Sequence, residues 1–160
     1  MNALVVYYSE FGNTKQVADA IAQTCRASGS VREISADKLE ASDVNNVDLL
    51  VFGTPTHMAN QPKALSLVLE DLPKGILKGV RVAAFDTSFN MNWFVNLFTA
   101  AKPLNRKLRQ LGGKQIVPPK SFFVADKQGP LCKGEIERAK NWAKNILTQY
   151  KCFPDPKQVT

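Results

Sequence analysis

Ser9-Glu10-Phe11-Gly12-Asn13-Thr14 follows directly after the apolar run 3–8 (ALVVYY) and directly precedes a helical pattern. A buried strand that turns through a glycine into a helix leaves backbone N–H groups free at the helix start, in front of the positive end of the helix dipole. Such a turn is suited to bind a phosphate. The short polar side chains of Ser9, Asn13 and Thr14 can reach the same anion or cap the helix. The alternative is an ordinary strand-to-helix turn with a polar cap.

Two common glycine-rich phosphate motifs do not fit this turn. A P-loop requires a Lys followed by Ser or Thr after its second glycine, and a dinucleotide fingerprint requires three spaced glycines. Gly12 is the single glycine here, and no such Lys pair follows it. The turn therefore favours a mononucleotide ligand over ATP or NAD.

Short apolar runs alternate along the chain with longer stretches of helical periodicity. Each of these stretches has apolar residues every three or four positions, and they predict helices over 13–28, 62–72, 93–111 and 133–150. The apolar runs predict strands over 3–8, 31–34, 49–52 and 80–85, and a fifth strand that Pro118 and Pro119 divide into 116–117 and 121–124. Apolar strands that alternate with helices indicate an α/β fold, a doubly wound five-stranded parallel sheet with helices on both faces.

Three loops of distinctive composition leave the carboxyl ends of the predicted strands, at 9–14, 53–62 and 86–93. In open parallel sheets, ligands bind beyond these ends, at the point where the strand order reverses. We therefore expect the three loops to converge on one site.

The composition is that of one globular domain. The 160 residues suffice for a single full core, which we expect over 1–150, while 151–160 form a C-terminal tail with little to bury. The N-terminal apolar run is too short for a signal peptide or a membrane span, which favours a cytoplasmic protein without membrane contact. Three scattered cysteines are typical of reduced thiols, and His57 as the single histidine offers little for a metal centre or a catalytic dyad.

The net charge of +7 is unevenly distributed. Residues 1–80 carry 7 Lys/Arg and 9 Asp/Glu, whereas residues 81–160 carry 14 and 5. The densest basic cluster, spread around a predicted helix, is Lys102, Arg106, Lys107 and Arg109. It has no interleaved aromatic residues and no nucleic-acid motif, so nucleic-acid binding is not expected. A solvated face is the simplest interpretation, and an acidic protein partner is the alternative.

Taken together, these loops resemble those of the flavodoxin family, over most of residues 1–150. Ser9-x-x-Gly12-Asn13-Thr14 is similar to the family's phosphate loop, which implies that it binds the phosphate of FMN through backbone amides and hydroxyls. Residues 53–57 (GTPTH) are similar to the family's Gly-Ser/Thr-Pro-Thr-aromatic loop, which meets the ribityl chain and the ring. Residues 86–93 (DTSFNMNW) stand where the family's third loop closes the pyrimidine side. Without an insert in the fifth strand, the chain resembles the short-chain type.

The resemblance implies roles for individual residues near the flavin. It places the backbone of Met58 at flavin N5, followed by Ala59, and Phe89 or Trp93 beside the ring. His57 either stacks on the ring or is a surface-loop histidine, and Trp93 alternatively packs inside the next helix. The implied cofactor-binding residues are Ser9, Glu10, Phe11, Gly12, Asn13, Thr14, Pro55, Thr56, His57, Met58, Ala59, Thr87, Ser88, Phe89, Asn90 and Trp93. Trp142 fits the buried stripe of the last helix and is interpreted as structural.

Three features depart from the flavodoxin pattern. Phe11 stands where flavodoxins often have a threonine, and an aromatic residue there is more similar to flavodoxin-type NAD(P)H:quinone oxidoreductases. Glu10 places a carboxylate near a dianion, which requires its side chain to turn to solvent. The chain is also basic, whereas electron-carrier flavodoxins are usually acidic.

The resemblance implies an FMN-binding electron-transfer protein, without a catalytic acid or base, that exchanges electrons with redox proteins, including acidic ones. A monomer or a weak homodimer is expected. An FMN-dependent NAD(P)H:quinone oxidoreductase is the alternative, and a flavodoxin-like binding module without flavin is a third hypothesis.

Overall fold

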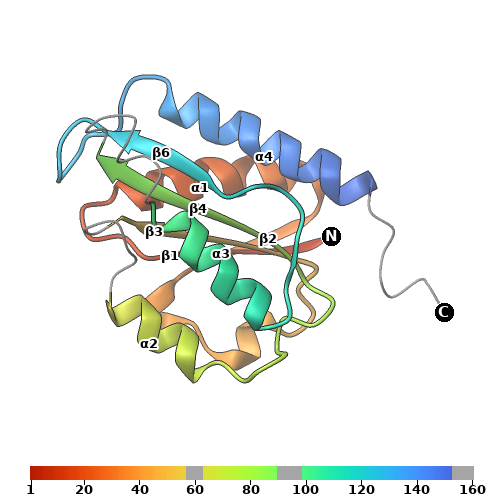
Figure 1. The fold of residues 1–160 in the computed structure, drawn as a ribbon. Coiled ribbons are helices and arrows are strands. Elements are labelled where there is room, and N and C mark those ends of the chain that lie inside the picture. The colour runs from red at the N-terminus through yellow and green to blue at the C-terminus, as the bar shows by residue number, and fades with distance from the viewer. Residues whose placement is uncertain (57–62, 90–98, 153–160) are drawn as a thin grey trace.

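The computed structural model describes residues 1–56, 63–89 and 99–152, with the side chains of 63 and 64 left aside (Figure 1). The strands are β1 (Asn2–Tyr7), β2 (Ser30–Ser35), β3 (Leu49–Pro55), β4 (Arg81–Phe89), β5 (Lys114–Gln115) and β6 (Lys120–Val124). The α-helices are α1 (Asn13–Cys25), α2 (Lys63–Asp71), α3 (Ala101–Gln110) and α4 (Glu135–Cys152). Short 3-10 helices follow at η1 (Arg26–Ser28), η2 (Ala36–Lys38) and η3 (Ala41–Val44).

The strands form one parallel sheet in the order β2-β1-β3-β4-β5, and β6 also pairs with β4. β5 and β6 thus form a divided fifth strand, as the two prolines predict. The strand order reverses between β1 and β3, which pair from Ala3↔Leu49 to Tyr7↔Gly53. The predicted α/β fold class is confirmed.

The helices cover both faces of the sheet. α1 and α4 pack together on one face, and α2 and α3 lie across the other (Figure 1). Alternate residues of the central strands therefore face two separate cores. On β4, Ala83 and Phe85 face α1 and α4, whereas Val82 and Ala84 face α2 and α3. Trp142 is buried against Phe85, with ring centroids 6.1 Å apart, which confirms its structural role.

Several boundaries differ from the sequence prediction. β3 and β4 extend beyond the predicted ends at 52 and 85, because they pair with each other as far as Pro55↔Thr87. Pro55, Thr87, Ser88 and Phe89 therefore lie in strands rather than in loops. β2 is an edge strand that is only half-buried, so it is not apolar on both faces.

Within the part of the predicted helix 93–111 that the structure describes, α3 begins at Ala101 and ends at Gln110; residues 90–98 lie outside the described part. The Asp86 carboxylate of β4 accepts the N–H of Ala101, the first residue of α3, and this bond holds the start of the helix. α4 starts two residues later than predicted and continues to Cys152, into the predicted tail.

Candidate functional site

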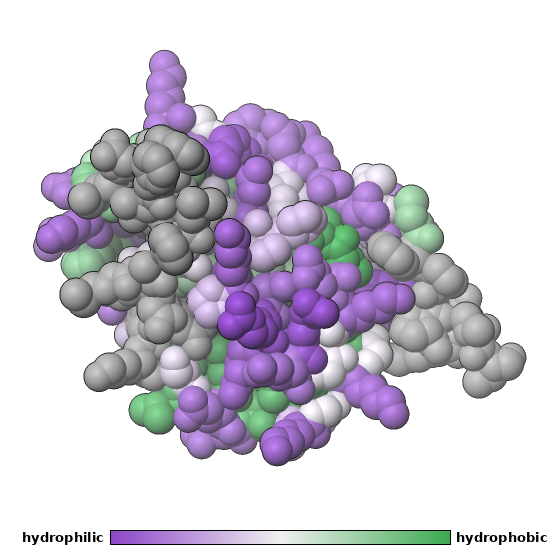
Figure 2. All heavy atoms as spheres, viewed as in Figure 1, coloured by the Kyte–Doolittle hydropathy of each residue, from purple (hydrophilic) through white to green (hydrophobic). Residues whose placement is uncertain are grey.

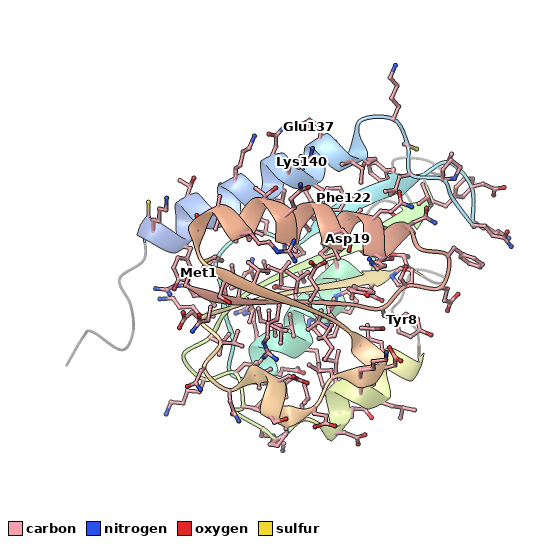
Figure 3. All side chains as sticks on the ribbon, turned by 180° about the vertical axis from the view of Figure 1, so that it is seen from behind. Met1, Tyr8, Asp19, Phe122, Glu137 and Lys140 are labelled. Atoms are coloured by element: carbon pink, nitrogen blue, oxygen red, sulfur yellow. The ribbon has the colours of Figure 1, made fainter. Side chains whose placement is uncertain are left out.

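The candidate site lies at the edge of the sheet where the parallel strands end. β1 and β3 flank the reversal of strand order, and the residues that follow them belong to the predicted loops. Figure 3 shows Tyr8 at this edge, directly after β1, where its backbone N–H donates to the carbonyl of Gly53 at 2.9 Å. This bond joins the ends of β1 and β3 across the reversal.

The turn 9–12 leads into α1 with the geometry that a phosphate requires. Gly12 is left-handed at φ 83°, and a Cβ added there would have no atom within 4 Å, so the turn leaves open space. The first turn of α1 contains no acidic residue that would neutralise the helix dipole. Glu10 is exposed, as an anion site requires, and Phe11 is 53% exposed. The residues present fit the phosphate of a mononucleotide.

Two hydroxyl groups are predicted to reach the anion from this turn, those of Ser9 and Thr14, and each has a different hydrogen-bond partner. Ser9 Oγ accepts a long hydrogen bond from the Lys15 N–H at 3.3 Å, across the start of α1. Thr14 is 2% exposed, and its hydroxyl pairs with that of Thr87 at 2.8 Å. Since a hydroxyl has one donor and two acceptor positions, this pair retains hydrogen-bonding capacity for a ligand. Ser9 thus makes a long bond to an N–H of the first helical turn, whereas the bond of the Thr14 hydroxyl is to Thr87.

Thr87 joins the three segments. Its hydroxyl contacts Thr14 of α1, and its carbonyl accepts the N–H of Thr56 at 2.8 Å. The described ends of the three predicted loops are therefore in contact at one edge of the sheet, as the sequence predicts.

Asn13, which the sequence predicts either to reach the anion or to cap the helix, bonds with its side-chain amide to another segment of the chain. It is 7% exposed, and its Nδ2 donates to the carbonyl of Gln128 at 3.0 Å. Gln128 lies in the connection between β6 and α4. This fourth segment was not among the three predicted loops, although 126–130 (DKQGP) is a polar turn after the last strand.

Asp86 is a second residue of the site that the sequence analysis did not select. It is fully buried, and its Oδ2 accepts hydrogen bonds from the Ala101 N–H at 2.7 Å and the Thr56 hydroxyl at 3.0 Å. The Thr56 hydroxyl in turn accepts the Ala100 N–H at 3.0 Å. Burial raises the pKa of Asp86, and the hydrogen bonds that it accepts oppose this rise. A signal was present, since Asp86 is a lone acid at the end of an apolar strand.

Ser88 follows Asp86 on the same face of β4. Its Oγ is buried, and no hydrogen-bond partner for it is found among the described residues. Because buried polar groups are nearly always paired, this hydroxyl is available to a ligand at the end of β4. Phe89, the next residue, is half-buried.

Gly53 has a structural role. A Cβ at this position would lie 2.0 Å from the ring of Phe85, so the glycine lets this aromatic residue pack beneath the strand end.

Five of the predicted site residues lie outside the described part of the chain, namely His57, Met58, Ala59, Asn90 and Trp93.

Across residues 1–56, 63–89 and 99–152, no group of three or more His, Cys, Asp or Glu could hold a metal ion. Within the same ranges, no helix has the length and the apolar character needed to cross a membrane.

Burial raises the pKa of the Cys25 thiol to about 11, so that this thiol is protonated at neutral pH.

Comparison with known proteins agrees with this geometry. The family model for flavodoxin matches residues 5–145. A flavodoxin of Clostridium saccharobutylicum is 28% identical over 157 residues, 94% of this chain and 98% of that protein. The structure of a flavodoxin of Streptococcus pneumoniae TIGR4 has a TM-score of 0.75 at 20% identity, covering 93% of this chain and 99% of that one.

A longer relative matches through part of its length. NADPH-dependent diflavin oxidoreductase 1 of Cryptococcus neoformans var. neoformans serotype D is 30% identical over 129 residues, 74% of this chain. This chain spans about a fifth of that relative's length, 20%. With a family match over most of its residues, and with an open helix-start turn beside the reversal of strand order, the chain belongs to the flavodoxin family.

Proposed function

We propose that this chain transfers electrons through an FMN whose phosphate is bound by residues 9–14. The observation that carries the proposal is the open, left-handed turn at Gly12, which precedes a helix start without acidic residues. It stands at the carboxyl end of β1, next to the reversal of strand order. When bound, FMN supplies a ring that accepts and releases one or two electrons.

The residues of this chain bind the flavin and orient it. Backbone N–H groups of the turn donate to the phosphate, helped by the positive end of the α1 dipole. The paired hydroxyls of Thr14 and Thr87 hold this turn against the end of β4. The buried Ser88 hydroxyl supplies a hydrogen bond at the neighbouring strand end. None of these roles requires a catalytic acid or base.

Comparison of FMN with riboflavin tests the proposal, because riboflavin lacks the phosphate. The double variant Ser9→Ala/Thr14→Ala is expected to weaken FMN binding at least about tenfold more than riboflavin binding, the loss of roughly one charge-assisted hydrogen bond. Dissociation constants are measured by flavin fluorescence quenching on the apoprotein.

Thr24→Ala is the matched control. Thr24 lies on the same helix, and its hydroxyl donates to the carbonyl of Ala20 at 2.8 Å, far along α1 from the turn. It is expected to leave both affinities unchanged. Equal losses for FMN and riboflavin in the double variant would contradict the phosphate assignment.

The partners that we propose are redox proteins with acidic surfaces. Lys102, Arg106 and Arg109 are exposed on α3 and stand four and three residues apart, on one side of the helix. Lys107, the fourth residue of the predicted cluster, lies off this side and is half-buried, so we call the other three the basic stripe. Figure 2 shows hydrophilic residues gathered over the region where Figure 1 places α3.

An FMN-dependent oxidoreductase that uses NAD(P)H is the second candidate. The diflavin oxidoreductase relative and the exposed aromatic Phe11 favour it. Steady-state oxidation of NADPH with a quinone as acceptor decides between the two. Turnover by this chain alone would support the enzyme, whereas electron exchange only with reduced redox proteins would support the carrier.

A further inference from the structure

A short segment between β6 and α4 folds back on itself beside the phosphate turn. Val124 and Leu131 form an antiparallel bridge, and the Ala125 N–H donates to the carbonyl of Pro130 at 2.8 Å. Inside the segment, the Gly129 N–H donates to the carbonyl of Asp126 at 2.9 Å. These bonds close residues 125–130 into a compact unit, which we call the 125–130 hairpin.

The 125–130 hairpin holds the phosphate turn through one side chain. Asn13, the first residue of α1, follows Gly12 directly, and its Nδ2 donates to the carbonyl of Gln128. Asn13 is almost completely buried. Because the anchor is the first residue of the helix, it fixes where the turn 9–12 ends.

Gly129 makes this close contact possible. A Cβ on Gly129 would lie 2.5 Å from Oδ1, 2.7 Å from Nδ2 and 2.9 Å from Cγ of Asn13. These three atoms, all in one side chain, lie closer than a Cβ can pack without displacing its neighbour. Any side chain at this position therefore displaces Asn13.

We propose that the 125–130 hairpin positions the phosphate turn, with Gly129 as the residue that lets it lie against Asn13. This inference rests on the proposed function, in which residues 9–14 bind the FMN phosphate. Displacement of the Asn13 side chain breaks its bond to Gln128, so the first N–H groups of α1 lose the contact that positions them at the anion. The ends of β3 and β4 are bonded to each other and keep their positions. The loss therefore affects the phosphate more than the rest of the ligand.

Gly129→Ala and Gly134→Ala are compared for the binding of FMN and riboflavin to the apoprotein. Both glycines have a left-handed φ, at 106° and 89°, so both substitutions introduce backbone strain. A Cβ at Gly134 has no atom within 4 Å, however. Gly129→Ala is expected to weaken FMN about tenfold and riboflavin less than about threefold, and Gly134→Ala to change each less than about threefold.

A double-mutant cycle distinguishes the effect of the contact with the Asn13 side chain from the effect of backbone strain at position 129. Asn13→Ala removes the three side-chain atoms that a Cβ at position 129 would meet, and keeps the backbone N–H at the turn. Asn13→Ala alone is expected to weaken FMN selectively, because the anchor to Gln128 is lost. Asn13→Ala/Gly129→Ala is then expected to bind FMN as Asn13→Ala does. Circular dichroism of each apoprotein verifies that it is folded.

The outcomes separate this inference from the proposed function. An unchanged ratio of FMN to riboflavin affinity in both Gly129→Ala and Asn13→Ala would overturn the inference alone. So would additive losses in the cycle, because these would arise from backbone strain. If Gly129→Ala does not fold, the selectivity of Asn13→Ala decides. A wild-type protein that binds riboflavin as tightly as FMN would instead overturn the proposed function.

Discussion

Asp86 connects three segments of the molecule from a position without access to solvent. Its Oδ2 accepts the first N–H of α3 and the hydroxyl of Thr56, which itself accepts the Ala100 N–H. A negative charge at a helix N-terminus is favourable and lowers the pKa of a carboxyl group there. For Asp86, burial outweighs this effect and raises the pKa above its ordinary 3.8. The side chain of Asp86 thus orders the chain around the site. Because it is buried, its charged form is less favourable in the folded protein than in water.

The stability of the protein should therefore depend on pH through Asp86. Between the pKa of the unfolded chain and the higher pKa of the folded one, the folded protein holds a proton that the unfolded chain has lost. The free energy of unfolding then falls as the pH rises from about 4 through the folded pKa, and levels off above it. Asp86→Asn cannot titrate, so its stability relative to wild type is expected to increase over that range.

Asp86→Ala is the contrasting variant, because it leaves the Ala101 N–H and the Thr56 hydroxyl without their acceptor. It is expected to cost about 2–4 kcal/mol at pH 7, and Asp86→Asn less, since an amide oxygen still accepts both bonds. Urea unfolding at several pH values between 4 and 8 measures both effects. A stability difference between wild type and Asp86→Asn that does not change with pH would show that this group does not titrate as described.

For the secondary-structure elements, the sequence predicts that a strand is present better than it predicts where the strand ends. The apolar runs at 49–52 and 80–85 locate β3 and β4, but pairing between the two carries them on to Pro55 and Phe89. Polar residues such as Thr54 and Asp86 belong to strands because a neighbouring strand binds their backbone. A local pattern contains no information about such a neighbour.

At the start of α4, Glu135 attaches the helix to β6. It is buried, its Oε2 accepts the Phe123 N–H at 2.8 Å, and Arg138 is paired with it at 2.5 Å. Glu135→Ala is expected to lower the free energy of unfolding by about 1–3 kcal/mol, mainly because it leaves the Phe123 N–H without an acceptor, since the Arg138 side chain is 39% exposed and its charge is screened by solvent. Urea denaturation measures the loss.

Glu137→Ala is the control for this prediction. Glu137 lies on the same turn of α4, exposed, with a distant ion pair to Lys140 at 3.8 Å. Its removal is expected to change stability by less than about 0.5 kcal/mol. Similar losses in the two variants would indicate that the negative charge in the first turn of α4, rather than the bond to β6, accounts for the effect.

For the whole molecule, the order of motifs along the chain predicted where the site lies, because parallel strands bring their carboxyl ends to one edge. What the sequence could not predict are contacts between distant segments. Asn13 and Gln128 are 115 residues apart, and no local pattern relates them. The same holds for Asp86, whose partners lie at residues 56 and 101.

The distribution of charge also belongs to the whole molecule. α3 starts at the candidate site, where Ala101 binds Asp86, and the basic stripe runs from Lys102 away from that edge. Seven residues of helix span about 10 Å, comparable to the Debye length of about 10 Å at 0.1 M salt. The stripe is therefore expected to attract an acidic redox protein at low salt and to lose this attraction as salt is added.

Lys102→Glu/Arg106→Glu tests this expectation, with Lys133→Glu/Lys144→Glu as the control that changes the net charge equally. Stopped-flow rates of electron exchange with an acidic ferredoxin are measured as the salt concentration increases. The stripe variant is expected to react about tenfold more slowly at low salt and to depend less on salt, because local charge controls association. The control is expected to stay within about threefold of wild type, and all three proteins to bind FMN alike. Equal slowing in the two variants would mean that the net charge, and not this helix, sets the rate.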